Sequence, residues 1–163
     1  MVRLATAADR PAIVRLQSHL ASPSPALVDL VGTDAALAVL DEPAADERTM
    51  LDAADAAATD ERPQGAATRA VGYALAISGD PAELCELAVA PGWRRQGRGR
   101  ALCAGLCSRL GREGTAAITS LAAADDDRAR GFHESVGFEA VGRVPDHFGP
   151  GLDAVRYRRS LSG

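Results

Sequence analysis

The chain has 163 residues and a formal net charge of −4, and its 18 basic residues are all arginine. This length suits one domain with a single core of ordinary size. Net acidity argues against a nucleic-acid partner, because binding to phosphate backbones needs a basic face. No apolar run approaches the ~20 residues of a membrane-spanning helix, so we expect no membrane partner.

Cysteine usage and the N-terminus predict the compartment. The first residues lack the apolar stretch of a secretion signal. Cys85, Cys103 and Cys107 are odd in number and lie inside apolar patterns. Such thiols fit buried positions in a reducing compartment better than disulfides or a metal site. We therefore expect a cytoplasmic protein without a bound metal.

Apolar periodicity and breaking residues predict seven strands and four helices. The predicted strands lie at 2–6, 36–40, 71–77, 84–90, 116–122, 139–144 and 153–160. The predicted helices lie between a Thr6/Asp9 cap and Ser22, and at 26–31, 97–112 and 127–136. Between the second and third strands, residues 41–69 form an excursion rich in acidic residues and alanine. It is read either as a solvated, partly helical or mobile segment or as an acidic lip that attracts a cationic amine.

The most informative stretch is residues 84–102. An apolar strand stops at Pro91, and a basic loop with Gly97 and Gly99 then leads into a helical pattern. A strand, a glycine loop and a helix N-terminus together bind pyrophosphate, because the first N–H groups of a helix have no internal partner. The dinucleotide fingerprint is excluded by Leu102 at its third glycine, and the triphosphate loop is excluded because the chain contains no lysine.

This stretch resembles the R/Q-x-x-G-x-G/A signature of the GNAT superfamily of acyl-CoA-dependent N-acetyltransferases. The matching residues are Arg94, Gln96, Gly97 and Gly99, with Val89 and Pro91 as the usual V-x-P upstream. Residues 126–138 are similar to a second motif of the superfamily, N-x-x-A-x-x-[FL]-Y-x-x-x-G-F. Here Asp126 replaces the usual asparagine and His133 replaces the usual tyrosine.

The resemblance covers essentially the whole chain and implies one N-acetyltransferase domain at 1–163. It implies a mixed α+β fold: a twisted, mostly antiparallel sheet of about seven strands flanked by about four helices. Strands four and five would part to hold acetyl-CoA, the expected co-substrate.

The resemblance also implies where the cofactor binds. The pantetheine and acetyl groups would lie beside the backbone of Leu87, Ala88 and Val89, with the Val89 N–H facing the developing oxyanion. The expected pyrophosphate residues are Arg94, Arg95, Gln96, Gly97, Arg98, Gly99 and Arg100. Asp126 is either a cofactor contact or the N-cap of its helix.

Three alternatives remain for the base: Glu86, Glu83 or water alone. A separation of three residues puts the two carboxylates on opposite faces of a regular strand, unless a bulge intervenes. For the acid, His133 takes the position of the superfamily's tyrosine, and it is either the proton donor to the leaving thiolate or a packing residue.

The acceptor is the least determined part. Residues 144–148, followed by Asp153 and Ala154, faintly resemble the C-terminal motif of RimI-type acetyltransferases, which modify protein N-terminal α-amines. The alternatives are a small-molecule amine (an antibiotic, polyamine or amino acid) and a catalytically weak sensor of acetyl-CoA. The sequence leaves open whether the chain forms a homodimer.

Overall fold

The computed structural model describes residues 1–44, 47 and 70–161. Most of the predicted 41–69 excursion therefore lies outside the described residues. Seven strands form one sheet in the order β1-β2-β3-β4-β5-β7-β6. Their bounds are β1 Val2–Leu4, β2 Ala36–Asp41, β3 Gly72–Ile77, β4 Ala82–Val89, β5 Ala117–Ala123, β6 Glu139–Val144 and β7 Ala154–Ser160. All neighbouring pairs are antiparallel except β4 and β5, which confirms the predicted mostly antiparallel sheet.

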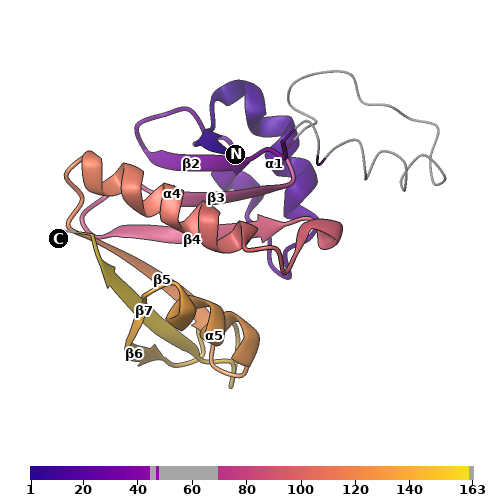
Figure 1. Cartoon of the computed structure of the whole chain (residues 1–163). Helices are drawn as coiled ribbons and strands as arrows, with labels where there is room; N and C mark the ends of the chain where they lie inside the picture. The colour runs from indigo at the N-terminus through magenta and orange to yellow at the C-terminus, as the bar shows by residue number, and fades with distance from the viewer. Residues whose placement is uncertain (45–46, 48–69, 162–163) are drawn as a thin grey trace.

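The helices are α1 (Arg10–Gln17), α2 (Pro25–Val28), α4 (Arg98–Arg112) and α5 (Asp127–Ser135). Two 3₁₀ turns, η1 (Ala7–Asp9) and η3 (Pro91–Trp93), complete the described elements. Figure 1 shows α4 lying across β2, β3 and β4, with α5 beside the β5, β7 and β6 half of the sheet. Among the described residues, every helix is too short or too polar to span a bilayer.

Two apolar cores lie on opposite faces of the sheet. On one face, α4 buries Leu102, Leu106 and Leu110, which recur at the helical spacing of one face. On the other face, α1 buries Ile13 and Leu16 against β2 and β3. The β1–β4 half of the sheet is thus covered on both sides, and the β4–β5 boundary lies where the two halves of the molecule meet.

The first helix begins with a 3₁₀ turn because Asp9 folds back on Thr6. The Asp9 carboxylate accepts hydrogen bonds from the Thr6 N–H at 2.8 Å and the Thr6 hydroxyl at 3.0 Å. Arg3 donates to both Asp9 oxygens, at 2.9 and 2.7 Å, and these bonds, together with those from Thr6, lower the pKa of that carboxyl to about 2. This forked pair joins β1 to the start of α1.

A bulge in β4 changes which side chains face α1. Leu75 of β3 is opposite Glu86, whereas the next β3 residue, Ala76, is opposite Leu84, so Cys85 is the extra residue. Leu84 packs in the α4 core, while Ala88 packs in the α1 core. Because side chains alternate on either side of the bulge, Glu83 and Glu86 both face the α1 side.

The parallel pairing of β4 with β5 is short. It runs from Ala82 opposite Ile118 to Leu84 opposite Ser120 and does not continue. In Figure 1 the two strands diverge beyond this point. This parting is what the resemblance implied for strands four and five.

Candidate active site

The loop before α4 presents its backbone N–H groups to a ligand. Arg95 has φ 64° and Gly97, the N-cap of α4, has φ 77°, both in the left-handed region. Among the described residues, no acceptor takes a hydrogen bond from the N–H groups of residues 95–100. A Cβ added at Gly97 would meet nothing within 4 Å. These open donors at a helix N-terminus fit the pyrophosphate of acetyl-CoA.

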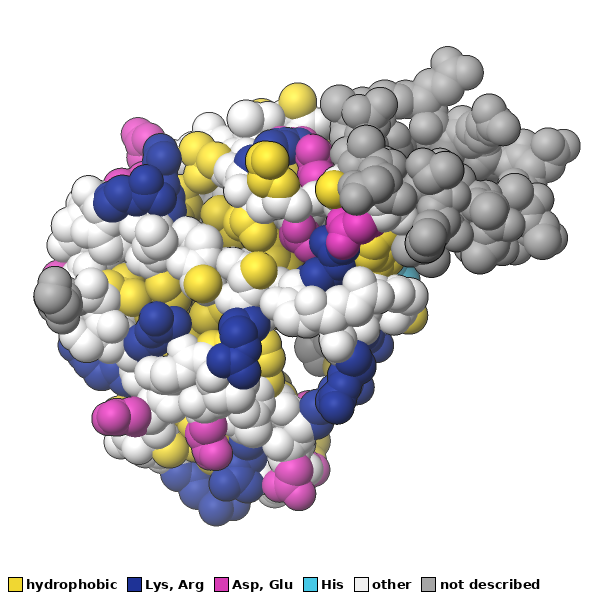
Figure 2. Space-filling model, viewed as in Figure 1, with side chains coloured by type: hydrophobic (Ala, Val, Ile, Leu, Met, Phe, Trp, Pro, Cys, Tyr) yellow, Lys and Arg dark blue, Asp and Glu magenta, His cyan; other side chains and the backbone are white. Residues whose placement is uncertain are grey.

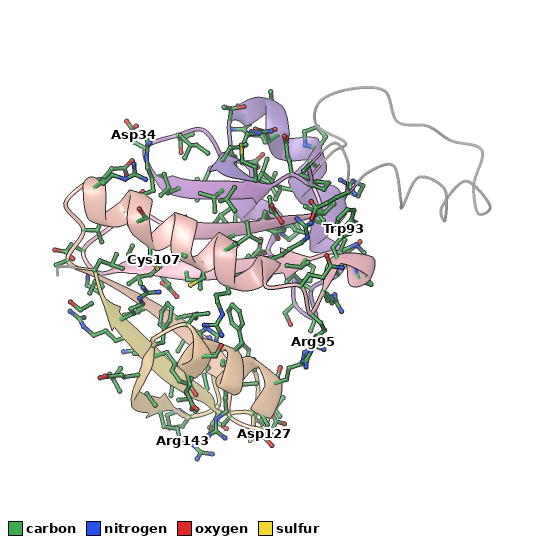
Figure 3. All side chains as sticks on the ribbon, in the orientation of Figure 1. Asp34, Trp93, Arg95, Cys107, Asp127 and Arg143 are labelled. Carbon is green, nitrogen blue, oxygen red and sulfur yellow. The ribbon has the colours of Figure 1, made fainter. Side chains whose placement is uncertain are left out.

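The polar side chains of this loop have different partners. Arg94 donates from Nε to the Val89 carbonyl at 2.8 Å, and Arg100 donates to the Ser135 carbonyl at 2.9 Å. Gln96 donates to the Gly92 carbonyl at 3.3 Å. Arg95 projects from the loop (Figure 3) and bonds no described residue, so its guanidinium is available to a phosphate.

Arg98 links the loop to β2. Its guanidinium pairs with Asp41 at 2.8 Å and with Glu47 at 2.9 Å, and it lies 4.5 Å from the centre of the Trp93 ring. Burial acts to lower the pKa of this guanidinium, but the carboxylates of Asp41 and Glu47 outweigh it, and the pKa is raised. Because these partners occupy the guanidinium of Arg98, only its backbone N–H is left for the predicted contact with the cofactor.

Gly99 serves close packing. A Cβ there would lie 3.3 Å from the Phe132 ring and 3.5 Å from Leu87. The missing side chain lets α5 and β4 approach the start of α4 together. Phe132 and Leu87 thus lie beside the loop before α4, where the strands part. Figure 2 shows the surface hollowed between the α4 and α5 halves, with arginine side chains beside the hollow.

The backbone of β4 beyond the bulge faces this opening at alternate residues. The Ala90 N–H donates to Val71 at 2.8 Å, on the β3 side. Because alternate residues of a strand address the same neighbour, Ala88 also bonds toward β3. Leu87 and Val89 then direct their N–H groups away from β3, into the opening. The N–H group of Ala88 is directed toward β3 and not into the opening, so it is not available for the predicted contact with the cofactor.

Glu86 is buried and fully hydrogen-bonded. Its carboxylate accepts from Gln17 Nε2 at 3.0 and 3.2 Å, from the Ser24 N–H at 2.7 Å and from the Tyr73 hydroxyl at 2.8 Å. Burial and the Glu86 charge raise the pKa of Tyr73, so its hydroxyl stays a donor. The carboxylate joins α1, the start of α2 and β3 to the site.

Glu83 has an exposed carboxylate on the same face. It lines a cavity of about 190 Å³ together with Pro81, Thr119, Ser120, Leu121 and Arg156. Because Ser120 is also in the last β4–β5 pair, this cavity reaches the point where the strands part. A larger cavity of about 660 Å³ between β1, β2 and the end of α4 has no basic side chain in its lining, so it suits no phosphate.

His133 lies at the same point, on the α5 side. Its Nδ1 lies 2.7 Å from the Ala129 carbonyl, and its Nε2 lies 3.0 Å from the Ser120 hydroxyl, which is 3.1 Å from the Leu84 carbonyl. Burial lowers the pKa of His133. Since a carbonyl can only accept, Nδ1 carries the proton, and the single proton of the Ser120 hydroxyl goes either to neutral Nε2 or to the Leu84 carbonyl. The ring also stacks on Tyr157, with centres 5.0 Å apart.

Asp126 is the N-cap of α5. Its side chain accepts a hydrogen bond from the Ala129 N–H at 2.9 Å. This is one of the two roles that the sequence left open, and it explains why a carboxylate suits this position.

The partners that hold these groups belong to no motif of the sequence. They are Gln17 and Tyr73 around Glu86, and Ser120 between β4 and β5. Gln17 directly follows Leu16 on the apolar face of α1, and a polar residue there signals a buried polar partner. Ser120 in the middle of an apolar strand carries a similar signal.

Comparisons with known proteins agree with this geometry. A profile of the acetyltransferase (GNAT) family matches residues 34–138. Comparison with curated proteins gives no match. The ribosomal-protein-S18-alanine N-acetyltransferase from Escherichia coli is similar in structure, with TM-score 0.73, 21% identity, and coverage of 100% of this chain and 94% of that chain.

Two further structures have the same fold. The aminoglycoside 6′-N-acetyltransferase from Enterococcus faecium has TM-score 0.75 at 14% identity, and the match covers 100% of this chain and 98% of that chain. Arabidopsis thaliana NAA60 in complex with acetyl-CoA has TM-score 0.73 at 14% identity, with 100% and 99% covered. The family profile spans most of the chain, and the open strands and pyrophosphate loop fit its co-substrate, acetyl-CoA. The chain therefore belongs to the acetyltransferase (GNAT) family of N-acetyltransferases.

Proposed function

We propose that this chain, as one domain over residues 1–163, moves the acetyl group of acetyl-CoA directly to a primary amine within a ternary complex. The observation that carries the proposal is that β4 and β5 part and that the groups on the two sides of the opening have different chemistry. On one side lie the open N–H groups of the α4 loop. On the other side lies a cavity lined by Glu83.

The proposed step is attack of the amine nitrogen on the thioester carbon. A C–N bond forms, the C–S bond breaks, CoA leaves as its thiolate and the amine loses a proton. The N–H groups of Leu87 and Val89 are the candidate donors to the oxyanion, because they are directed into the opening. Val89 is favoured by the family resemblance.

For the base we favour Glu83 over Glu86. Glu83 is exposed in the cavity, whereas both oxygens of Glu86 already accept hydrogen bonds from three donor groups, and a fourth donor would have to compete with them. Water remains the alternative. For the acid, the hydrogen bonds of His133 favour a packing role, and proton donation by His133 stays a prediction.

We propose a protein N-terminal α-amine as acceptor, with a small-molecule amine as the alternative. An α-amine has a pKa near ~7.7–8.0 and is partly neutral at pH 7, so it needs less help from a base than a lysine side chain does. The similar structures include an alanine N-acetyltransferase and an aminoglycoside N-acetyltransferase, so both kinds of acceptor occur on this fold.

The test is acetyl transfer to a panel of peptides and small amines, followed by CoA release and by the mass of the product. We expect acetylated product from at least one amine class, with peptide N-termini preferred. Binding of acetyl-CoA without transfer to any amine would instead support the sensor alternative.

A further inference from the structure

The cavity beside Glu83 contains one positive charge. It is lined by residues of β4, β5 and β7, and Arg156 of β7 is its basic side chain. Glu83 and Arg156 form no ion pair with each other. A carboxylate and a guanidinium therefore face one small space without neutralising each other.

The strand register places no charged residue directly opposite Arg156. Its direct neighbours across the sheet are Leu121 on β5 and Gly142 on β6, and neither carries a charge. A Cβ at Gly142 would meet nothing within 4 Å, so the space at the residue opposite Arg156 on β6 is open. Arg156 makes no hydrogen bond or ion pair with any described residue, unlike Arg143, which pairs with Asp153 at 2.7 Å.

The size of the cavity limits what can occupy it. About 190 Å³ corresponds to about six water molecules at ~30 Å³ each, which is room for a single amino-acid residue. An acceptor with its amine near Glu83 would place the next few atoms of its skeleton near Arg156. A guanidinium binds a carboxylate through two parallel hydrogen bonds, which adds geometric selectivity to the charge attraction.

We propose that the acceptor is a primary amine with a carboxylate a few bonds from its nitrogen, and that Arg156 binds this carboxylate. The inference rests on the proposed acetyl transfer to an amine and names the acceptor's chemistry. Two sources share this chemistry: a free α-amino acid, and a peptide whose first residue is acidic.

The test uses pairs of acceptors that differ in one charge. The first arm compares free α-amino acids with their α-amides, and the second compares peptides that begin with Asp with peptides that begin with Asn. We expect kcat/KM to be about 10- to 100-fold higher for the charged member in at least one arm, and the arm identifies the source. Arg156→Gln should remove the preference through KM with kcat retained, and Arg156→Lys should restore part of it.

Arg109→Gln is the matched control, because it removes one arginine charge from an exposed pair on α4. It should leave the preference unchanged, and CoA affinity should be equal in all variants. Transfer to amines without preference for the charged member overturns this inference and leaves the proposed function standing. A preference that survives Arg156→Gln also overturns it. Absence of transfer to every amine overturns both.

Discussion

Glu83 and Glu86 lie three residues apart on β4 but differ in what surrounds their oxygen atoms. Glu83 faces the solvent of a cavity, whereas the donors around Glu86 come from three other parts of the chain. A base must take a proton from the substrate amine, so it needs an oxygen that a substrate can reach. A carboxylate that holds three segments together has a structural task instead.

Glu83→Gln should lower kcat/KM by about 100-fold, because an amide cannot accept the amine proton and general bases contribute about 10²–10⁴-fold. The loss should be largest at low pH, where the neutral amine is scarce. Steady-state rates from pH 6 to 9 measure this. Glu139→Gln is the matched control, since Glu139 is exposed on β6 and lies outside the cavity lining.

Glu86→Gln separates the two carboxylates. It weakens charge-assisted hydrogen bonds to buried donors and should lower the free energy of unfolding by about 2 kcal/mol. If Glu86→Gln, folded at the assay temperature, loses transfer while Glu83→Gln retains it, then Glu86 is the base.

His133→Phe should slow transfer by less than about tenfold at saturating substrates. A phenyl ring would keep the stacking position beside Tyr157, and the Ser120 hydroxyl would give its one proton to the Leu84 carbonyl. CoA affinity and turnover measure the effect. A fall of about 100-fold or more with unchanged CoA affinity would instead assign proton donation to His133.

At the scale of elements, the turn before α4 depends on the left-handed conformation of Gly97. Gly97→Val should weaken CoA binding by at least about tenfold, since a β-branched residue strongly disfavours φ 77° and a shifted turn misdirects the N–H groups. Calorimetric titration with CoA measures the change. Gly92→Ala in the same loop is the control, because a Cβ there meets nothing within 4 Å. Equal CoA affinity in Gly97→Val and the parent would show that the pyrophosphate does not bind at this loop.

The elements follow the sequence patterns closely, and the reasons are local. Leu102, Leu106 and Leu110 fix α4, and alternating burial fixes β4 up to its bulge. The bulge itself was only an open alternative, because nothing in residues 83–86 requires the extra residue to be Cys85. The first helix ends at Gln17, before Leu20, since the chain turns toward Pro23 and Pro25.

At the scale of the whole molecule, the Arg3–Asp9 pair links stability to pH. The pKa of Asp9 falls from 3.8 to about 2 on folding, so the pair stabilises above pH ~4 and its contribution is lost as pH falls toward 2. Arg3→Gln should therefore cost about 2 kcal/mol at pH 7 and progressively less below pH 4. Urea unfolding at several pH values measures this.

Arg109→Gln again serves as control, because the exposed Arg109–Glu113 pair contributes at most about 0.5 kcal/mol. A cost of Arg3→Gln that stays constant between pH 7 and pH 2 would contradict the coupling of Asp9 to Arg3.

The candidate site was predictable where one segment forms it and unpredictable where several meet. The loop of Arg95 and Gly97 follows from a contiguous motif, because its strand, turn and helix are adjacent in the sequence. The environment of Glu86 depends on Gln17, which is 69 positions away in the chain, and that of Arg156 depends on residues of β4 and β5. Only strand register and the covering helices decide which of these polar groups meet.

The bulge at Cys85 also bears on the order in which substrates come and go. Acetyl-CoA would be held through backbone groups at the opening, while the amine would contact side chains on the α1 face, so the two substrates approach β4 from different sides. Both substrates can then be bound at the same time, before either product leaves. We expect intersecting lines when initial rates are plotted against both substrates, and no acetylated enzyme in the absence of amine.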